Sequence, residues 1–284
     1  MRTVGVIGGS GLYEMAGLER PERVRLTTPF GVPSDEFLCG TLAGVRMLFL
    51  PRHGRGHRIL PSEVNFRANV YGMKTLGAEW LIGVASVGSL REEIVPGHLV
   101  VPDQLIDRTS KRPSTFFGNG VVAHVAFADP FCPRLSALLV EAAQRLGVPV
   151  HARGTYVCME GPQFSTRAES VLYRQWGADV IGMTNLQEAK LAREAEICFA
   201  TLALATDYDC WHETQADVVI SDVLRTLNEN VAAAQQVIAA ALPQLQSPRT
   251  CACARALEHA IITDRAHIPD AVKRDLDILI GKYL

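Results

Sequence analysis

Two aspartates that follow an apolar segment are the residues of this chain best placed for acid–base chemistry. Asp207 and Asp209 stand in ATDYDCW, directly after an apolar stretch that ends at Thr206. Because that stretch is a predicted strand, both carboxylates should emerge on the same side at its end. Burial raises the pKa of an aspartate above its usual value of about 3.9, so a protonated carboxyl can serve as a general acid. A helix N-cap or a solvated turn is the alternative interpretation.

The chain begins with a predicted strand and a glycine-rich turn, VGVIGGSGL at residues 4–12. Glycines let a backbone approach an anion closely and direct its N–H groups inward. The spacing of a dinucleotide site is not met, because Glu14 stands where a third glycine is required. A phosphate or ribose-phosphate loop that uses the Ser10 hydroxyl is the better interpretation.

Two further turns after predicted strands carry donors for an anion. PRHGRGHRILP contains Arg52, which offers phosphate a planar fork of N–H groups, and His53, which can add one more donor. GVASVGSLREEI ends a strand in small residues, where Ala85 and Ser86 supply backbone donors. A solvated basic loop and an ordinary turn are the alternatives.

The sequence does not indicate a metal site or an acyl-transfer triad. The eight histidines show neither HExxH nor paired spacing, and no GxSxG motif occurs. Cys251-x-Cys253 with His259 could be half of a metal site, but we expect only two thiols to converge there. The seven cysteines are spread through apolar segments, which is typical of buried thiols in a reducing cytosol.

Composition excludes several classes of protein. Of 284 residues, 48% are hydrophobic, and 28 Lys+Arg against 30 Asp+Glu give a formal charge of −2. This is the balance of a chain with a sizeable core and not of a disordered one. Near-neutral charge gives no footprint for nucleic acid or an anionic membrane, and no apolar run approaches the ~20 residues that span a bilayer. The start of the chain does not resemble a secretion signal. We therefore expect a cytoplasmic protein without nucleic-acid or membrane partners.

Short apolar runs alternate with amphipathic segments, which predicts one α/β domain followed by a short tail. Several runs are apolar at consecutive positions, as in strands covered on both faces. The predicted strands are 4–7, 46–50, 80–85, 99–101, 155–159, 180–183 and 199–206. The predicted helices are one that begins at a Ser62 N-cap, then 133–146, 167–176, 186–195 and 221–241, and a last one from Pro269. We place the boundary between domain and tail after residue 245, giving 1–245 and 246–284.

Taken in order, these motifs closely resemble the trimeric purine nucleoside phosphorylase family, and within it the 5′-methylthioadenosine phosphorylases. The similarity covers about residues 3–245. It is carried by GGSGLY, PRHGRGH, ASVGSLREEIVPG, IDRTSKRPSTFF, EGPQFSTRAES, ATDYDCW and VLRTLNEN. The resemblance implies a twisted mixed central β-sheet flanked by helices. It also implies phosphorolysis, in which inorganic phosphate attacks C1′ of a nucleoside and releases the base and a sugar 1-phosphate.

The resemblance also assigns roles to particular residues. It implies that phosphate contacts Ser10, Arg52, His53, Ala85, Ser86 and Thr184. It implies that the nucleoside contacts Phe164, Met183, Asp207, Asp209, Ile220, Val223 and Leu224, and that Ser165 and Ile220 influence specificity. His124 resembles a residue that reaches the neighbouring subunit's site, which implies a homotrimer or a dimer of trimers. Phosphate is then a co-substrate, and no cofactor or metal is expected.

Residue chemistry favours a 6-aminopurine with an apolar 5′ group. A protonated Asp207 can donate to N7 and accept from a 6-amino group, whereas a 6-oxopurine offers two acceptors and suits an amide better. The apolar residues of the 220–224 segment accept a methylthio group and leave a 5′-hydroxyl unpaired, at a cost of about 1–3 kcal/mol. A 6-oxopurine or methylthioinosine phosphorylase, a nucleoside-binding module without turnover, and an NAD(P) dehydrogenase remain as alternatives.

Overall fold

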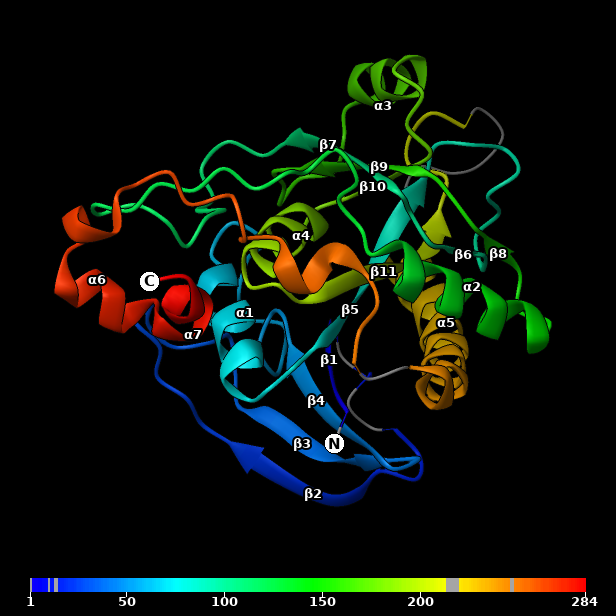
Figure 1. Ribbon diagram of the computed structural model, residues 1–284. Helices are drawn as coiled ribbons and strands as arrows, with labels where there is room; N and C mark the ends of the chain where they lie inside the picture. The colour runs from blue at the N-terminus through cyan, green and yellow to red at the C-terminus, as the bar shows by residue number, and fades with distance from the viewer. Residues whose placement is uncertain (1, 10, 13–14, 213–219, 246–247) are drawn as a thin grey trace.

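The computed structural model describes residues 2–9, 11–12, 15–212, 220–245 and 248–284, and it describes residues 220–225 and 227 only as backbone (Figure 1). One mixed sheet runs through the molecule, with helices on both faces, so the predicted fold class is confirmed. The strands are β1 Thr3–Gly8, β2 Glu19–Val24, β3 Phe37–Leu42, β4 Val45–Pro51, β5 Trp80–Ser89, β6 Leu99–Val100, β7 Gln104–Arg108, β8 Val150–His151, β9 Thr155–Met159, β10 Val180–Gly182 and β11 Cys198–Asp207. The helices are α1 Phe66–Thr75, α2 Pro133–Arg145, α3 Arg167–Gln175, α4 Asn185–Glu194, α5 Ile220–Ala241, α6 Asp270–Asp275 and α7 Asp277–Ile280.

Strand β5 organises the sheet, because it pairs with three other strands. β11 runs parallel to it along one edge, from Trp80 to Gly88. On the other edge, β1 pairs in parallel with residues 80–83 and β10 pairs antiparallel with residues 88–89. The carboxyl ends of β1 and β10 therefore face each other across residues 84–87 of β5. The sheet opens at this point, and openings outside strand carboxyl ends are where ligands bind in α/β sheets.

Two layers of helices cover the sheet. Helices α2 and α5 pack against each other and against β11 on one face, and the apolar residues of β1, β4 and β5 that point to this face complete that core. Helices α1 and α4 pack on the opposite face. Residues 248–284 add buried side chains to the core beneath α1 and α4, among them Leu257, Ile268 and Ile280. The tail and the body of the protein thus share one core.

Element prediction was most accurate for the helices. The strands β2, β3, β7 and β8 were missed, and the strand predicted at 80–85 continues to Ser89, so Ala85 and Ser86 lie within β5 and not in a turn after it. The helices predicted at 133–146, 167–176, 186–195 and 221–241 agree with the structure to within about two residues at each end. The predicted N-cap at Ser62 is wrong, because Asn65 caps α1 and its side chain accepts a hydrogen bond from the Ala68 N–H at 3.1 Å. Strand β2, with the sequence ERPERV, was missed because it is a polar, exposed edge strand without an apolar period. None of the helices described here is long and apolar enough to cross a membrane.

Candidate active site

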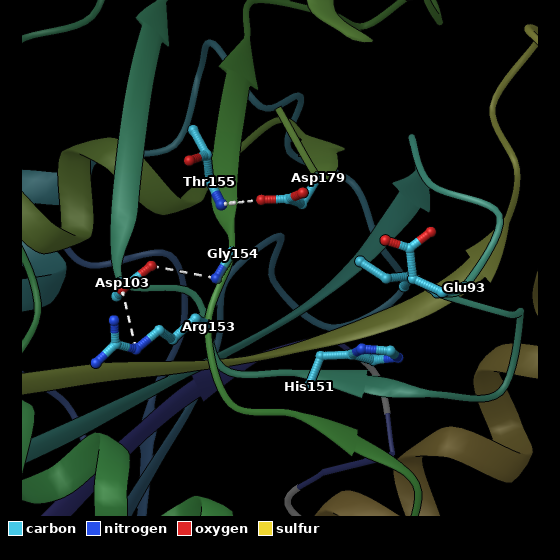
Figure 2. Close-up of a pocket in the computed structure, with 8 residues that line it drawn as sticks. Glu93, Asp103, His151, Arg153, Gly154, Thr155 and Asp179 are labelled. Carbon is cyan, nitrogen blue, oxygen red and sulfur yellow. Dashed lines mark hydrogen bonds and ion pairs between the residues drawn. The ribbon is translucent and has the colours of Figure 1, made fainter. Parts of the chain in front are cut away.

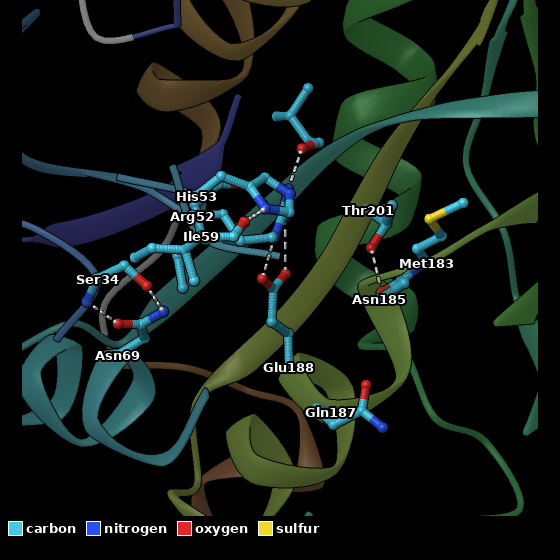
Figure 3. Close-up of polar contacts among 12 residues, drawn as sticks. Ser34, Arg52, His53, Ile59, Asn69, Met183, Asn185, Gln187, Glu188 and Thr201 are labelled. Carbon is cyan, nitrogen blue, oxygen red and sulfur yellow. Dashed lines mark hydrogen bonds and ion pairs between the residues drawn. The ribbon is translucent and has the colours of Figure 1, made fainter. Parts of the chain in front are cut away.

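A buried ion pair connects the elements around the opening in the sheet (Figure 3). Arg52 follows β4 and is 2% exposed, and Glu188 lies in the first turns of α4 at 1%. Two parallel hydrogen bonds of 2.5 and 3.0 Å join Arg52 Nε and Nη2 to the two carboxylate oxygens of Glu188. Arg52 also donates to the carbonyls of Ile7 and Val84, at 3.1 and 3.0 Å. One arginine thus joins β1, β4, β5 and α4.

The same contacts limit what Arg52 can offer to a phosphate. A guanidinium has five N–H groups, and these bonds use four of them, which leaves one on Nη1. The sequence predicted a free planar fork, and that prediction is wrong. The fork is occupied by Glu188, a residue 136 positions away that spacing could not reveal.

His53 differs from its predicted role as a hydrogen-bond donor. Burial, assisted by the positive charge of Arg52, lowers the pKa of His53 to about 4, so its imidazole is neutral at neutral pH. Nδ1 lies 2.8 Å from the Ile59 carbonyl, which can only accept, so Nδ1 carries the hydrogen. Nε2 is then an acceptor, and it can take a hydrogen bond from a phosphate O–H.

The opening beside β5 supplies backbone donors for an anion. The Val84 carbonyl faces the Arg52 side of β5, and peptide groups alternate in direction along a strand. The Ser86 N–H therefore points into the opening, and the Ala85 N–H points toward β11. Thr184 is the N-cap of α4, it is buried, and its side chain makes no capping hydrogen bond. The N-terminus of α4 thus faces the same region, and helix N-termini favour anions.

The two aspartates lie at the carboxyl end of β11, as predicted. Asp207 is half-buried, and burial raises the pKa of its carboxyl. Oδ1 accepts from the Asp209 N–H at 2.8 Å, and Oδ2 lies 2.7 Å from the Thr206 hydroxyl. Asp209 has a φ of 51°, and burial, with the charge of Asp207, raises its pKa as well. Its Oδ2 is buried without a hydrogen-bond partner, a costly state that recurs at binding sites.

The Thr206 hydroxyl allows Asp207 to exist in both protonation states. Its oxygen lies near two acceptors, the Val87 carbonyl at 3.3 Å and Asp207 Oδ2 at 2.7 Å, but it has one hydrogen. It donates to Asp207 when that carboxyl is ionised. When the carboxyl is protonated, the hydroxyl can turn to Val87 and accept the carboxyl proton. The carboxyl therefore keeps a partner in each state.

Three loops converge beside these carboxylates. In the loop between β9 and α3, Gly161 has a φ of 65°, and an added Cβ there would lie 2.5 Å from Met183 Sδ. The Ser165 carbonyl accepts from Cys210 Sγ at 3.3 Å, which connects this loop to the turn after β11. Phe164, in the same loop, is 53% exposed. The loop of Ser165 thus lies against the turn after β11, and Met183 lies against that loop at Gly161.

Arg112 was not predicted, and it holds two of these loops together. Its side chain is 1% exposed and forms an ion pair with Glu160 at 3.1 Å. It also donates to the Met183 and Glu160 carbonyls. Gln187 lies inside α4, with Oε1 3.4 Å from Arg112 Nη1. The motif IDRTSKRPSTFF was the available signal, but nothing in its spacing indicates which loops its arginine reaches.

Other predicted residues are outside the site as a single chain presents it, or outside the description. His124 is exposed, on the segment that pairs with residues 260–262 of the tail. Ser10 lies outside the described residues, and so do the side chains of Ile220, Val223 and Leu224. Their assignments stay predictions.

A cavity of about 260 Å³ lies at the opposite ends of two of these strands (Figure 2). Its walls include Thr155, the first residue of β9, and Asp179, which directly precedes β10. The Thr155 N–H donates to Asp179 Oδ2 at 2.7 Å. Met183 and Thr184 follow the carboxyl end of β10, so this cavity is separate from the candidate active site.

The expectation that only two thiols converge near the tail is wrong. The Sγ atoms of Cys132, Cys198, Cys251 and Cys253 all lie within 4.8 Å of one another. The first two are 53 and more residues from the Cys-x-Cys pair, so only tertiary packing brings them together.

Comparisons with known proteins agree with this geometry. Residues 3–243 match the family model described as the phosphorylase superfamily. The chain belongs to the phosphorylase superfamily. It is 61% identical, over 100% of its length and 99% of the relative's, to the S-methyl-5′-thioadenosine phosphorylase of Geobacter sulfurreducens.

Solved structures of this superfamily share the fold over nearly the whole chain. A methylthioadenosine phosphorylase from an Antarctic soil metagenomic library superposes with a TM-score of 0.93 at 48% identity, covering 98% of both chains. A mutant adenosine/methylthioadenosine phosphorylase of Schistosoma mansoni in complex with methylthioadenosine gives 0.83 at 35%, covering 91% of this chain and 96% of that one. The family resemblance predicted from the motifs is confirmed.

We expect Arg52→Ala to destabilise the phosphorylase strongly, because it leaves Glu188 buried without a partner. Breaking such a pair costs about 3–5 kcal/mol, which lowers the melting temperature by on the order of 10 °C. Thermal unfolding followed by circular dichroism measures this, with Arg55→Ala in the neighbouring exposed loop as the control. A double variant, Arg52→Met with Glu188→Leu, should recover much of the loss. A melting temperature for Arg52→Ala equal to that of Arg55→Ala would contradict the role of the pair.

We expect Gly88→Ala to damage the site more than the fold. An added Cβ would lie 3.1 Å from Asp207 Oδ1 and 3.2 Å from Asp209 Cβ, which displaces both carboxylates. Gly154→Ala is the matched control, because its Cβ is similarly crowded, at 3.3 Å from Val100, but lies at the amino end of β9. Both variants should lose a similar small amount of stability. Only Gly88→Ala should lower kcat/KM, by roughly tenfold or more, and equal kinetics in the two variants would count against this site.

Proposed function

We propose that this protein catalyses the phosphate-dependent cleavage of 5′-methylthioadenosine to adenine and 5-methylthioribose 1-phosphate. The observation that carries the proposal is the pair of carboxyls at the end of β11, one half-buried and one buried, beside an opening lined with anion donors. This pair occurs in a chain that is similar over its full length to S-methyl-5′-thioadenosine phosphorylases. The protein is accordingly a pentosyltransferase.

Departure of the base is assisted at its N7 atom. As the bond between C1′ and N9 breaks, its electron pair moves into the purine ring, and the ring needs a proton. Because burial raises the pKa of Asp207, a protonated carboxyl is available to donate to N7. The unpartnered Oδ2 of Asp209 is free to accept a hydrogen bond from a 6-amino group. Adenine satisfies both carboxyls.

Phosphate supplies the nucleophile and stabilises the sugar. The Ser86 N–H, the N-terminus of α4 with Thr184, and the remaining Nη1 hydrogen of Arg52 are its donors. His53 Nε2 accepts from the phosphate O–H and so orients the anion. A phosphate oxygen forms the new bond to C1′ while positive charge develops on the ribose, and the anion stabilises that charge. The proposed reaction uses phosphate as co-substrate and no organic cofactor.

A 6-oxopurine nucleoside is the alternative substrate. Hypoxanthine presents acceptors at both N7 and O6, so two carboxyls cannot both satisfy it unless both are protonated. At the 5′ position, the apolar residues assigned from the motifs, Ile220, Val223 and Leu224, favour methylthio over hydroxyl. The preference for methylthioadenosine over inosine therefore rests on both ends of the nucleoside.

We also propose that the enzyme works as a homotrimer in the cytoplasm. His124 is exposed, and beside it Val122 and Ile262 are 48% and 65% exposed, which is the composition of a surface that another subunit covers. A neighbouring His124 would then close a nucleoside site from outside. Cysteines distributed through buried segments support a reducing compartment.

The first experiment is an assay of the purified protein with methylthioadenosine, adenosine, inosine and methylthioinosine, each with and without phosphate. We expect adenine release from methylthioadenosine, dependent on phosphate, to be the fastest reaction. A faster reaction with either 6-oxopurine nucleoside would keep the phosphorolysis and overturn the assignment of Asp207 and Asp209 to N7 and the 6-amino group of adenine. Binding without release of base in all four cases would overturn catalysis.

We expect Asp207→Asn to lower kcat for methylthioadenosine by about 10²–10⁴-fold with a smaller change in KM, because it removes the proton donor. Its activity relative to wild type should be better preserved with inosine, since an amide can donate to O6. Asp270→Asn on the exposed face of α6 is the control. Unchanged kcat in Asp207→Asn would remove Asp207 from the mechanism.

A pH profile tests the same group. The raised pKa of Asp207 means that its protonated fraction falls as pH rises through that raised value. The wild-type kcat should therefore decline toward alkaline pH, and Asp207→Asn should lack the part of this decline that Asp207 causes. Titration of phosphate itself affects both proteins equally.

A further inference from the structure

Four cysteines form a cluster at the edge of the α2–α5 layer, away from the nucleoside site. Cys198 is the first residue of β11, so it lies at the opposite end of that strand from Asp207. Cys132 is the N-cap of α2, and its N–H donates to the Phe199 carbonyl at 2.7 Å. The other two cysteines come from the tail: Cys251 precedes the 3₁₀ turn Ala252–Arg255, and Cys253 lies within it.

The four sulfur atoms are arranged as neighbours of one another and not as two separate pairs. All four Sγ atoms lie within 4.8 Å of each other, and the Sγ atoms of Cys198 and Cys251 are 3.2 Å apart. A tetrahedral zinc ion with Zn–S bonds of about 2.3 Å places its sulfur ligands about 3.8 Å apart. A small adjustment of four side chains therefore gives a tetrathiolate site. Three of the four are buried, as the ligands of a closed structural site are.

Positively charged groups lie near the four sulfur atoms. Arg249 Nη1 lies 3.7 Å from Cys198 Sγ, and Arg249 and Arg134 both line the narrow cavity beside the cluster. Cys132 also lies at the N-terminus of the 13-residue helix α2, whose dipole stabilises a negative charge. Positive charge thus approaches the sulfur atoms from two elements.

We propose that Cys132, Cys198, Cys251 and Cys253 bind one zinc ion as a tetrathiolate. Binding converts four thiols to thiolates and releases four protons, and the resulting site carries a charge of −2, which Arg249 partly offsets. Four protein ligands complete the coordination, so the ion has a structural role and takes no part in phosphorolysis. The site is independent of the proposed activity.

The ion fastens the tail to the body of the protein. Beyond the cluster, the tail pairs with the segment that carries His124: the His124 N–H donates to the Ala260 carbonyl, and the Val122 N–H donates to Thr263 Oγ1, at 2.9 and 2.8 Å. A metal that fixes Cys251 and Cys253 against Cys132 and Cys198 therefore also stabilises the support of this segment.

The test is a metal count on the full-length protein, produced with added zinc and purified under reducing conditions without chelator. We expect about one zinc per chain by elemental mass spectrometry. The double variant Cys251→Ser with Cys253→Ser should lose that zinc, and its melting temperature should fall by several degrees. Cys39→Ser, a buried thiol of β3 outside the cluster, should retain the zinc. Cobalt exchanged into the wild type should give the sulfur-to-cobalt charge-transfer and tetrahedral bands of a tetrathiolate.

Three results would overturn the proposal. The first is reduced wild-type protein that takes up neither zinc nor cobalt. The second is a double serine variant that holds as much zinc as the wild type. The third is purified protein in which the four cysteines form two disulfides, seen as a mass lower by four hydrogens, and which binds no metal after reduction. If the double variant fails to fold, the zinc count and cobalt spectrum of the wild type decide alone.

Discussion

The buried ion pair between Arg52 and Glu188 is the constraint on which the site depends. Removing two charges from water costs more free energy than their mutual attraction recovers, unless each charge also forms several hydrogen bonds. Arg52 meets this demand by donating to Glu188 and to the carbonyls of Ile7 and Val84, so the ends of β4 and β1, the middle of β5 and the start of α4 must all meet at one point. Arg52 first holds β1, β4, β5 and α4 together, and these elements surround the proposed anion site.

The opening in the sheet follows from this constraint. β1 and β10 approach β5 from opposite directions along one edge and stop short of each other, which leaves residues 84–87 without a strand partner on that edge. Backbone donors exposed in this way, and the N-terminus of α4, cost little because water or an anion can satisfy them. On the other side of β5, Asp207 and Asp209 lie at the end of β11. Burial raises the pKa of both carboxyls, which suits proton donation. One sheet thus positions an anion site and an acid site.

The sequence predicted correctly those secondary-structure elements that have a clear local pattern of apolar residues. Runs of apolar residues identified β1, β4, β9 and β11, and the aspartates after β11 were correctly placed at a strand end, but the buried strand β3 was missed and Ala85 and Ser86 lie inside β5 instead of in a turn after it. Prediction failed for β2, where an edge strand carries no apolar period, and for the N-cap of α1, where Asn65 and not Ser62 makes the hydrogen bond. It also failed for Arg112, since an arginine that crosslinks Glu160 and the Met183 carbonyl looks the same in sequence as one in solvent.

The sequence alone determined the fold class and the family. It also determined that Asp207 and Asp209 lie together at a strand end, because two residues only two positions apart in sequence are necessarily neighbours in space. Only the tertiary structure decided the charge and hydrogen-bonding state of each group. The pKa of His53 depends on burial and on Arg52, and the donors of Arg52 depend on a glutamate 136 residues away. The four-cysteine cluster likewise exists only because α2, β11 and the tail meet. Electrostatics and coordination depend on distance in space, and separation along the chain does not specify that distance.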